Sequence, residues 1–213
     1  MSERGKYIVI EGSDGTGKST QVEMLAKKLA AAGTRSVLIH EPDGVPVAAR
    51  LRDIIKDGTL ERDAWTNVLM FTAARRANWL QQMQPALERG EWVLAARNWL
   101  STVVYQGYGE GESIDRIEKF TLENVSETYA HPDLTLILAL NDELTRQGRI
   151  NKRGDLEVPD TFESRPLDFQ ERVKGGYVRY ANEHDFTVLD ATGSQDDVQK
   201  VIWQHVEPLV VRT

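Results

Sequence analysis

A glycine-rich segment that ends in a lysine and a serine constrains this chain more than any other part of the sequence. The pattern G-x-x-x-x-G-K-[ST] is matched by Gly12-Ser-Asp-Gly-Thr-Gly-Lys18-Ser19. The segment follows an apolar run, Tyr7–Glu11, and precedes a stretch with helical apolar spacing that extends to about Ala32. A strand, a glycine-rich turn and a helix in this order predict a phosphate-binding loop, and hence a nucleoside triphosphate site.

The residue types in this loop suit a triphosphate. Gly12, Gly15 and Gly17 let backbone N–H groups approach phosphate oxygens where a Cβ would obstruct them. The start of the helix adds unpaired N–H groups and a partial positive charge. Lys18 is expected to reach the β- and γ-phosphates, and the Ser19 hydroxyl to bind Mg²⁺. The expected ATP-binding residues are Gly12, Ser13, Asp14, Gly15, Thr16, Gly17, Lys18, Ser19 and Thr20.

The rest of the chain alternates short apolar runs with helical stretches. The expected strands are Tyr7–Glu11, Ser36–His40, Val93–Ala96, Leu134–Leu140 and Thr187–Asp190. Near-continuous apolar strands separated by helices predict a parallel sheet that is covered on both faces. The sequence therefore predicts an α/β fold of the three-layer P-loop NTPase type, with a five-stranded parallel sheet. Because no linker-like tract divides the 213 residues, we expect a single domain over residues 1–213.

One polar segment, Arg146–Pro166, interrupts this pattern. It is rich in both charges and contains two glycines and two prolines, so it cannot be a core element. It is either a solvated loop or a short lid that brings basic side chains over a phosphate site. Its basic residues are Arg146, Arg149, Lys152, Arg153 and Arg165.

Composition excludes several classes of function. The sequence has no cysteine, which excludes disulfides, thiolate metal sites and cysteine nucleophiles. Its net charge of −7 argues against a nucleic-acid partner. The apolar runs are far shorter than the ~20 residues of a membrane span, and the amino-terminal segment has no apolar signal core. We therefore expect a cytoplasmic protein with no membrane and no nucleic-acid partner.

A P-loop alone leaves open a GTPase, an ATPase motor and a small-molecule kinase. A GTPase needs an N-K-x-D motif, which this sequence lacks, and a motor ATPase usually needs a longer chain. A small kinase needs a second phosphate site, an acceptor pocket and a lid that neutralises charge.

Further motifs lie in a recognisable order and spacing. They are Tyr7-Ile-Val-Ile-Glu-Gly12, Glu41-Pro42-x-Gly44, Leu69-Met-Phe71-Thr-Ala-Ala-Arg75-Arg76, Arg97-x-x-x-Ser101-Thr102-x-x-Tyr105-Gln106-Gly107, Pro132-Asp-Leu-Thr135 and Phe169-Gln-Glu-Arg-Val-x-x-Gly-Tyr177. With these motifs the chain resembles the bacterial thymidylate kinases from Lys6 to about Leu209. The resemblance implies transfer of the γ-phosphoryl group of ATP to dTMP with Mg²⁺, giving dTDP and ADP in dTTP biosynthesis.

The resemblance also implies an acceptor site. Phe71 would stack on the thymine ring, and Arg75, Thr102 and Gln106 would bind the edge of the base. Tyr105 would pack against the sugar and disfavour a 2′-hydroxyl. Phe71 and Arg75 are four residues apart on one expected helix, so they face the same space. The implied dTMP-binding residues are Glu41, Arg52, Phe71, Arg75, Arg97, Ser101, Thr102, Tyr105 and Gln106.

Arg52 and Arg97 would hold the acceptor phosphate. That phosphate is already a nucleophile, so the protein has to position it and cancel charge rather than supply a strong base. Asp14 would order the acceptor side. In one subgroup of the family a catalytic arginine lies in the P-loop, where this chain has Gly15, so the lid must supply it. The expected catalytic residues are Lys18, Arg97, Asp14, Arg149 and Arg153, with Arg165 and Arg146 as further lid candidates.

The chain departs from the family pattern at a few positions. Ala96 replaces an aspartate after the third strand, and Thr161 replaces a frequent lid arginine. His40 and Asp43 replace a frequent arginine and glycine. Two alternatives therefore stay open: a kinase for dUMP or UMP, and a catalytically impaired nucleotide-binding regulator. The resemblance further implies a homodimer, with Trp65, Trp79 and Trp99 either on the shared face or in the core.

Overall fold

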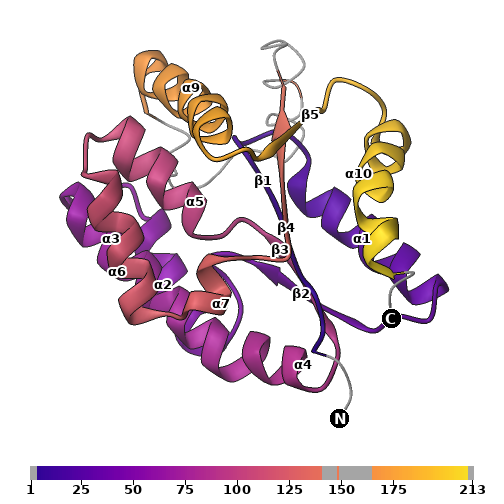
Figure 1. The fold of residues 1–213 in the computed structure, drawn as a ribbon. Coiled ribbons are helices and arrows are strands. Elements are labelled where there is room, and N and C mark those ends of the chain that lie inside the picture. Colours follow the sequence, from indigo (N-terminus) through magenta and orange to yellow (C-terminus); the bar gives the residue numbers. More distant parts are fainter. Residues whose placement is uncertain (1–3, 141–147, 149–164, 211–213) are drawn as a thin grey trace.

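The computed structural model describes residues 4–140, 148 and 165–210 (Figure 1). A five-stranded parallel sheet forms its centre, in the order β2-β3-β1-β4-β5. The strands are β1 (Tyr7–Gly12), β2 (Ser36–His40), β3 (Trp92–Ala96), β4 (Leu134–Ala139) and β5 (Thr187–Asp190). All five predicted strands are confirmed to within one residue at either end, and with them the predicted fold class.

Helices cover both faces of the sheet (Figure 1). One face carries α1 (Lys18–Ala31) and α10 (Gln195–Val210). The other face carries α2 (Pro46–Lys56), α3 (Ala64–Asn78), α4 (Gln84–Glu88), α5 (Trp99–Thr102), α6 (Ile114–Asn124), α7 (Glu127–Ala130) and α9 (Leu167–Glu183). Two π-helical segments, Trp79–Met83 and Val103–Gly109, directly follow α3 and α5.

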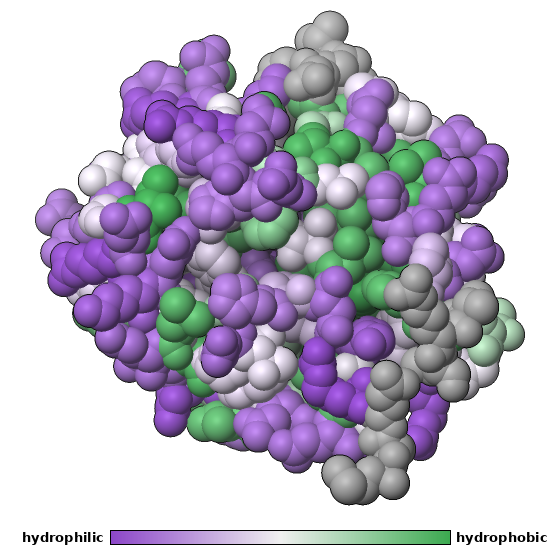
Figure 2. Space-filling model, in the orientation of Figure 1, coloured by the Kyte–Doolittle hydropathy of each residue, from purple (hydrophilic) through white to green (hydrophobic). Residues whose placement is uncertain are grey.

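The central strand β1 shows how the core is divided. Tyr7 and Val9 are fully buried among the helices from α2 to α9, whereas Ile8 and Ile10 are buried against α1 and α10. This alternation is the period of a strand that is covered on both faces. Burying each of these side chains contributes about 1.5–3 kcal/mol. The hydrophobic residues visible in Figure 2 gather in the middle of the face, over the sheet, and hydrophilic residues cover the helices.

The structure gives the positions of the three tryptophans that the sequence could not assign to the core or to a shared face. Trp79 and Trp99 lie in the core, with 4% and 7% of their surface exposed. Trp65 is half-buried and packs edge-on against Phe120, at 5.4 Å between ring centroids. Two of the three are therefore core residues.

Part of the predicted lid, together with Arg149, Arg153 and Thr161, lies outside the described residues. Within the described part of the chain, we find no helix with the length and hydropathy needed to cross a membrane.

The fold brings three loops to one edge of the sheet. The P-loop follows β1, the Glu41 loop follows β2, and Arg97 directly follows β3. Because the strands are parallel, their carboxyl ends meet at this edge, which is where ligands bind in sheets of this kind.

Candidate active site

The P-loop conformation depends on its glycines. Gly12 has a φ of 141°, and a Cβ at this position would lie 2.4 Å from the carbonyl oxygen of Leu138. Gly17 has a φ of 93° and precedes the first residue of α1 in a left-handed conformation. Lys18 Nζ donates to the carbonyl oxygen of Ser13 at 2.8 Å, which holds the lysine over the loop. The loop leads directly into the amino-terminal end of α1, the end of a helix that favours anions.

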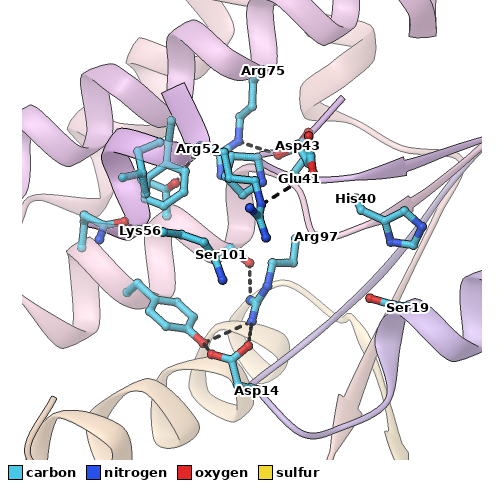
Figure 3. A pocket seen from close by; sticks show the side chains of 16 residues that line it. Asp14, Ser19, His40, Glu41, Asp43, Arg52, Lys56, Arg75, Arg97 and Ser101 are labelled. Carbon is cyan, nitrogen blue, oxygen red and sulfur yellow. Dashed lines mark hydrogen bonds and ion pairs between the residues drawn. The ribbon is translucent and has the colours of Figure 1, made fainter. Parts of the chain in front are cut away.

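A cavity of about 250 Å³ opens next to this loop (Figure 3). Asp14 and Ser19 of the P-loop region line it, together with all nine predicted acceptor residues: Glu41, Arg52, Phe71, Arg75, Arg97, Ser101, Thr102, Tyr105 and Gln106. One cavity is thus lined by all nine predicted acceptor residues and by two of the nine predicted ATP-binding residues. Sequence reasoning missed Pro42, Ile55 and Lys56, and noted His40 and Asp43 only as departures; all five also line the cavity.

Arg97 links the acceptor side to the P-loop. Its backbone is held in the left-handed region, with a φ of 75°, a conformation that costs about 1–3 kcal/mol and is concentrated at functional sites. Its guanidinium donates to Asp14 Oδ1 at 2.5 Å and to Ser101 Oγ at 2.9 Å. Tyr105 donates its hydroxyl to the other Asp14 oxygen at 2.9 Å.

The charge state of Asp14 follows from these contacts. Burial raises the pKa of Asp14, but the charges of Arg97 and Lys18 and the hydrogen bonds from Tyr105 and Arg97 outweigh it. Its pKa therefore lies well below the usual range, and the carboxylate stays charged wherever the protein is folded at ordinary pH. Burial also raises the pKa of Tyr105, so its hydroxyl remains a donor to Asp14.

Glu11 is a buried carboxylate that sequence reasoning did not single out. It accepts hydrogen bonds from the backbone N–H groups of Asn98 and Ser101 at 2.8 and 3.1 Å, and from the Tyr177 hydroxyl at 2.8 Å. These bonds hold the segment that follows Arg97 against β1, and so they restrict the position of Arg97. The available signal was an acidic residue at the end of an apolar strand, directly before the glycine-rich loop.

Arg75 forms the opposite wall of the cavity. Its guanidinium donates to Glu41 Oε2 at 2.8 Å, to Thr102 Oγ1 at 2.6 Å and to the carbonyl oxygen of Asn98 at 2.9 Å. Burial raises the pKa of Glu41, and Arg75 and the Tyr129 hydroxyl offset only part of that rise. These three contacts, on the loop after β2 and at the two ends of α5, fix the direction of the guanidinium.

Tyr105 and Gln106 lie on the π-helical segment Val103–Gly109, a kind of element that recurs at functional sites. Gln106 donates its amide to Glu110 at 3.1 Å, and its Oε1 atom is buried without a hydrogen-bond partner among the described residues. Arg165, one of the lid candidates, forms an ion pair with Glu110. The Gln106 oxygen is thus an unused acceptor in the cavity wall.

The two departures at the ends of β2 and β3 are neighbours. His40 and Ala96 are paired in register between these strands, and His40 lines the cavity near Ser19 (Figure 3). Among the described residues, no cluster of three or more histidine or acidic side chains could hold a metal ion. Ser19, the second residue of α1, lines the cavity on the P-loop side.

A P-loop that opens onto a cavity with several basic side chains, at one edge of a parallel sheet, is the arrangement of a P-loop kinase of small phosphorylated molecules. Residues 10–202 match the thymidylate kinase family. The chain belongs to that family, an ATP-dependent class of nucleoside monophosphate kinases, and the resemblance predicted from the sequence is confirmed.

Similar proteins cover nearly the whole chain. A thymidylate kinase from Burkholderia ambifaria is 36% identical over 202 residues, covering 92% of this chain and 94% of that protein. One from Deinococcus radiodurans is 36% identical over 205 residues, covering 95% and 97%. The crystal structure of thymidylate kinase from Ehrlichia chaffeensis superposes with a TM-score of 0.74 at 23% identity, covering 96% of this chain and 99% of that one. The last likeness concerns the fold alone.

Proposed function

We propose that this protein is a thymidylate kinase that transfers the γ-phosphoryl group of ATP to the 5′-phosphate of dTMP, giving dTDP and ADP. The observation that carries the proposal is the shared cavity, in which nine acceptor-site residues and two P-loop residues, Asp14 and Ser19, line one space. Donor and acceptor phosphates must meet in line, and a common cavity at one sheet edge permits this.

The base end of the cavity suits a pyrimidine. Phe71 stacks on the ring, which is worth about 1–3 kcal/mol per base. Arg75 and Thr102 supply donors at the base edge, and the hydrogen bond between them fixes their relative positions. The unpaired Oε1 atom of Gln106 supports an acceptor role towards the ring N–H of thymine. Tyr105 packs against the deoxyribose.

The phosphate end of the cavity suits two approaching polyanions. Arg52 and Arg97 hold the acceptor phosphate, and Asp14 orients Arg97. An oxygen of the acceptor phosphate forms the new bond to the γ-phosphorus, and the bond from that phosphorus to the β–γ bridging oxygen breaks. Lys18 stabilises the charge that moves to the leaving ADP.

The residues present fit Mg²⁺. This cation prefers phosphate oxygens and water with only one or two protein ligands, so the lack of a carboxylate at Ala96 does not exclude it. We assign Ser19 as the protein ligand, beside oxygens of the triphosphate. When bound, Mg²⁺ would draw charge from the phosphates. We propose that Arg149 and Arg153, in a lid of about residues 146–166, neutralise the charge of the transferred phosphoryl group. We also propose that residues 1–213 form a single kinase domain.

We also propose that the protein acts as a cytoplasmic homodimer. Val47 and Ile54, seven residues apart on α2, are 49% and 44% exposed, and Leu69 on the adjacent α3 is 43% exposed. Exposed apolar side chains on two packed helices support a contact between copies. Light scattering coupled to size exclusion tests this, with Ile54→Asp expected to give monomers.

The experiment that tests the function is a coupled ADP-release assay with ATP, Mg²⁺ and a panel of nucleoside monophosphates. We expect dTMP to be fastest, dUMP slower and UMP slower still, with the Lys18→Ala variant near background. Faster turnover of UMP than of dTMP would contradict the proposal. Tight binding of ATP and dTMP without ADP formation would instead identify a nucleotide-binding regulator.

A further inference from the structure

Among the described residues, the side-chain amide of Gln106 has a hydrogen-bond partner at one end only. Its Nε2 group donates to Glu110 Oε2 at 3.1 Å, whereas its Oε1 atom is buried without a partner in this part of the chain. Gln106 lines the acceptor cavity, and 0% of its surface is exposed. A buried acceptor that no donor reaches lowers stability, and a ligand that donates at this point removes that cost.

Glu110 determines which end of the Gln106 amide is left for a ligand. An ionised carboxylate has only acceptors, so it binds the NH₂ group of an amide and not the carbonyl oxygen. In the reversed orientation the amide oxygen would face the carboxylate, and two negative groups would repel each other. The carboxylate therefore keeps the NH₂ group turned towards itself and the amide oxygen turned away.

Glu110 is held in place from the segment that leads into α9. Arg165 forms an ion pair with Glu110 Oε1, so the other carboxylate oxygen serves Gln106, and only 10% of the Glu110 side chain is exposed. The preceding carbonyl oxygen, that of Gly109, accepts two hydrogen bonds from the Arg172 guanidinium, at 3.1 and 3.0 Å. The carboxylate thus has a fixed position relative to the amide, unlike a pair of side chains on an exposed helix surface.

The pyrimidine bases differ in the atom that would meet an acceptor in this wall. The ring nitrogen N3 carries a hydrogen in thymine and in uracil, whereas in cytosine N3 is itself an acceptor. An acceptor opposite N3 therefore binds the first two bases and repels the third. A reversed amide would have the opposite preference, because its NH₂ group can donate to N3 of cytosine. Discrimination of this kind combines an attractive contact with a repulsive one.

We infer that Glu110 is a positioning residue that gives the acceptor site its preference for thymine and uracil over cytosine. The inference rests on the proposed function and deepens it, because it names what excludes the third pyrimidine. Glu110 is not among the described residues that line the cavity, so it acts through the orientation of Gln106.

The test compares Glu110→Gln with Glu112→Gln. Glutamine at position 110 keeps the shape of the side chain but can accept or donate, so it satisfies either orientation of the Gln106 amide. We expect the ratio of kcat/KM for dTMP to kcat/KM for dCMP to fall about tenfold, the size of one hydrogen bond. Glu112 follows in the same loop, and its side chain lies 4.0 Å from Arg116, so its variant keeps the wild-type ratio.

Two matched comparisons separate the orientation of the amide from a loss of structure. dUMP carries the same N3–H group as dTMP, so the ratio of dTMP to dUMP stays at the wild-type value in Glu110→Gln. Glu110→Asp keeps a group that only accepts, so it retains most of the wild-type ratio of dTMP to dCMP. The melting temperature of Glu110→Gln stays within about 3 °C of wild type, because the partly exposed ion pair with Arg165 contributes little.

A ratio of dTMP to dCMP that stays at the wild-type value in Glu110→Gln would overturn the inference, even if every acceptor is turned over more slowly. An equal fall in the ratio of dTMP to dUMP would also overturn it, since a loosened site would then be responsible. Failure of the proposed function is distinct, because it is read from wild type with dTMP. If wild type does not turn dTMP over, calorimetric titration of dTMP and dCMP into wild type and Glu110→Gln gives the same ratio as dissociation constants.

Discussion

Arg75 and Glu41 form an ion pair of 2.8 Å in which only 2% and 1% of the two side chains are exposed. The pair connects α3 to the loop after β2, and the Tyr129 hydroxyl donates a hydrogen bond of 2.6 Å to the other oxygen of Glu41. A buried ion pair adds little net stability compared with apolar residues, but loss of one partner leaves a buried charge without compensation. The base end of the cavity thus depends on both members.

Glu41→Ala is therefore expected to lower the free energy of unfolding by about 3–5 kcal/mol. Urea denaturation followed by tryptophan fluorescence measures this. Arg76→Ala, at the exposed position next to Arg75, serves as the control and should cost no more than about 1 kcal/mol. A Glu41→Ala variant as stable as this control would show that Arg75 does not depend on its partner.

The lowered pKa of Asp14 predicts a specific pH dependence. A depressed folded-state pKa means that the unfolded state binds the proton more tightly, so the stabilisation is fully present above the unfolded pKa of about 3.9. It is lost as the pH falls through the folded-state value. The difference in unfolding free energy between wild type and Asp14→Asn should be constant from about pH 5 to 8 and shrink below about pH 4.

Urea titrations across that pH range provide the measurement. Asp53→Asn, at an exposed site on α2, gives the background for loss of a surface carboxylate. Asp14→Asn should also lower kcat/KM for dTMP, because Arg97 loses the charge that orients it. A stability difference that grows on acidification would contradict the assignment.

Much of this architecture is predictable because it depends on residue patterns that are local in the sequence. The strands are runs of apolar residues, and Gly12, Gly15 and Gly17 of the P-loop have positive φ angles, which favour glycine. The acceptor residues followed from family motifs. Their convergence then follows from the parallel sheet, which brings the segments after β1, β2 and β3 to one edge.

The features that were missed depend on contacts between distant segments. In the sequence, Glu11 is simply part of an apolar strand. Its role depends on hydrogen bonds from Ser101 and Tyr177, which are distant in the sequence. The π-helical segment under Tyr105 has no local residue pattern that distinguishes it from an α-helix. Lys56 ends α2 and was not singled out, because its place in the cavity wall is set by tertiary packing.

Gly12→Ala should disrupt the P-loop by sterics rather than by lost chemistry. The new Cβ would meet the Leu138 carbonyl at 2.4 Å and the backbone has a φ of 141°, which disfavours any side chain. Gly33→Ala is a matched control, since its φ is 81° but the space around it is open. We expect the control to cost about 1 kcal/mol and Gly12→Ala several times more, in thermal or urea unfolding. Equal costs would mean that the backbone at Gly12 shifts freely.

Arg149→Ala and Arg153→Ala test the proposed lid chemistry. If these residues stabilise the transferred phosphoryl group, each substitution lowers kcat and leaves the KM for ATP nearly unchanged, since the interaction is made chiefly in the transition state. A transition-state arginine can be worth about 10³–10⁵ in rate. Steady-state kinetics with dTMP decide this, and normal kcat values in both variants would assign the role to another residue.

Glu11→Gln tests whether one buried carboxylate positions the acceptor side. The carboxylate accepts from three backbone N–H groups, the Ser101 hydroxyl and Tyr177, whereas the amide of glutamine keeps only one oxygen as an acceptor. Its NH₂ group would then face donors and leave at least one of them unsatisfied. We expect a loss of about 3 kcal/mol in unfolding free energy, the cost of an unsatisfied buried group next to a lost charge.

Tyr177→Phe separates this role from simple packing. It removes one hydroxyl that donates to Glu11 and also contacts Ser101 Oγ at 3.1 Å and Arg97 Nη1 at 3.2 Å, and it should cost about 1 kcal/mol. Because Glu11 also holds the backbone of Ser101, Glu11→Gln should lower kcat/KM for dTMP much more than Tyr177→Phe does. If the two variants lose the same stability and activity, the contacts of the Tyr177 hydroxyl account for the whole effect, and the bonds that Glu11 accepts from the backbone of Asn98 and Ser101 do not position the acceptor side.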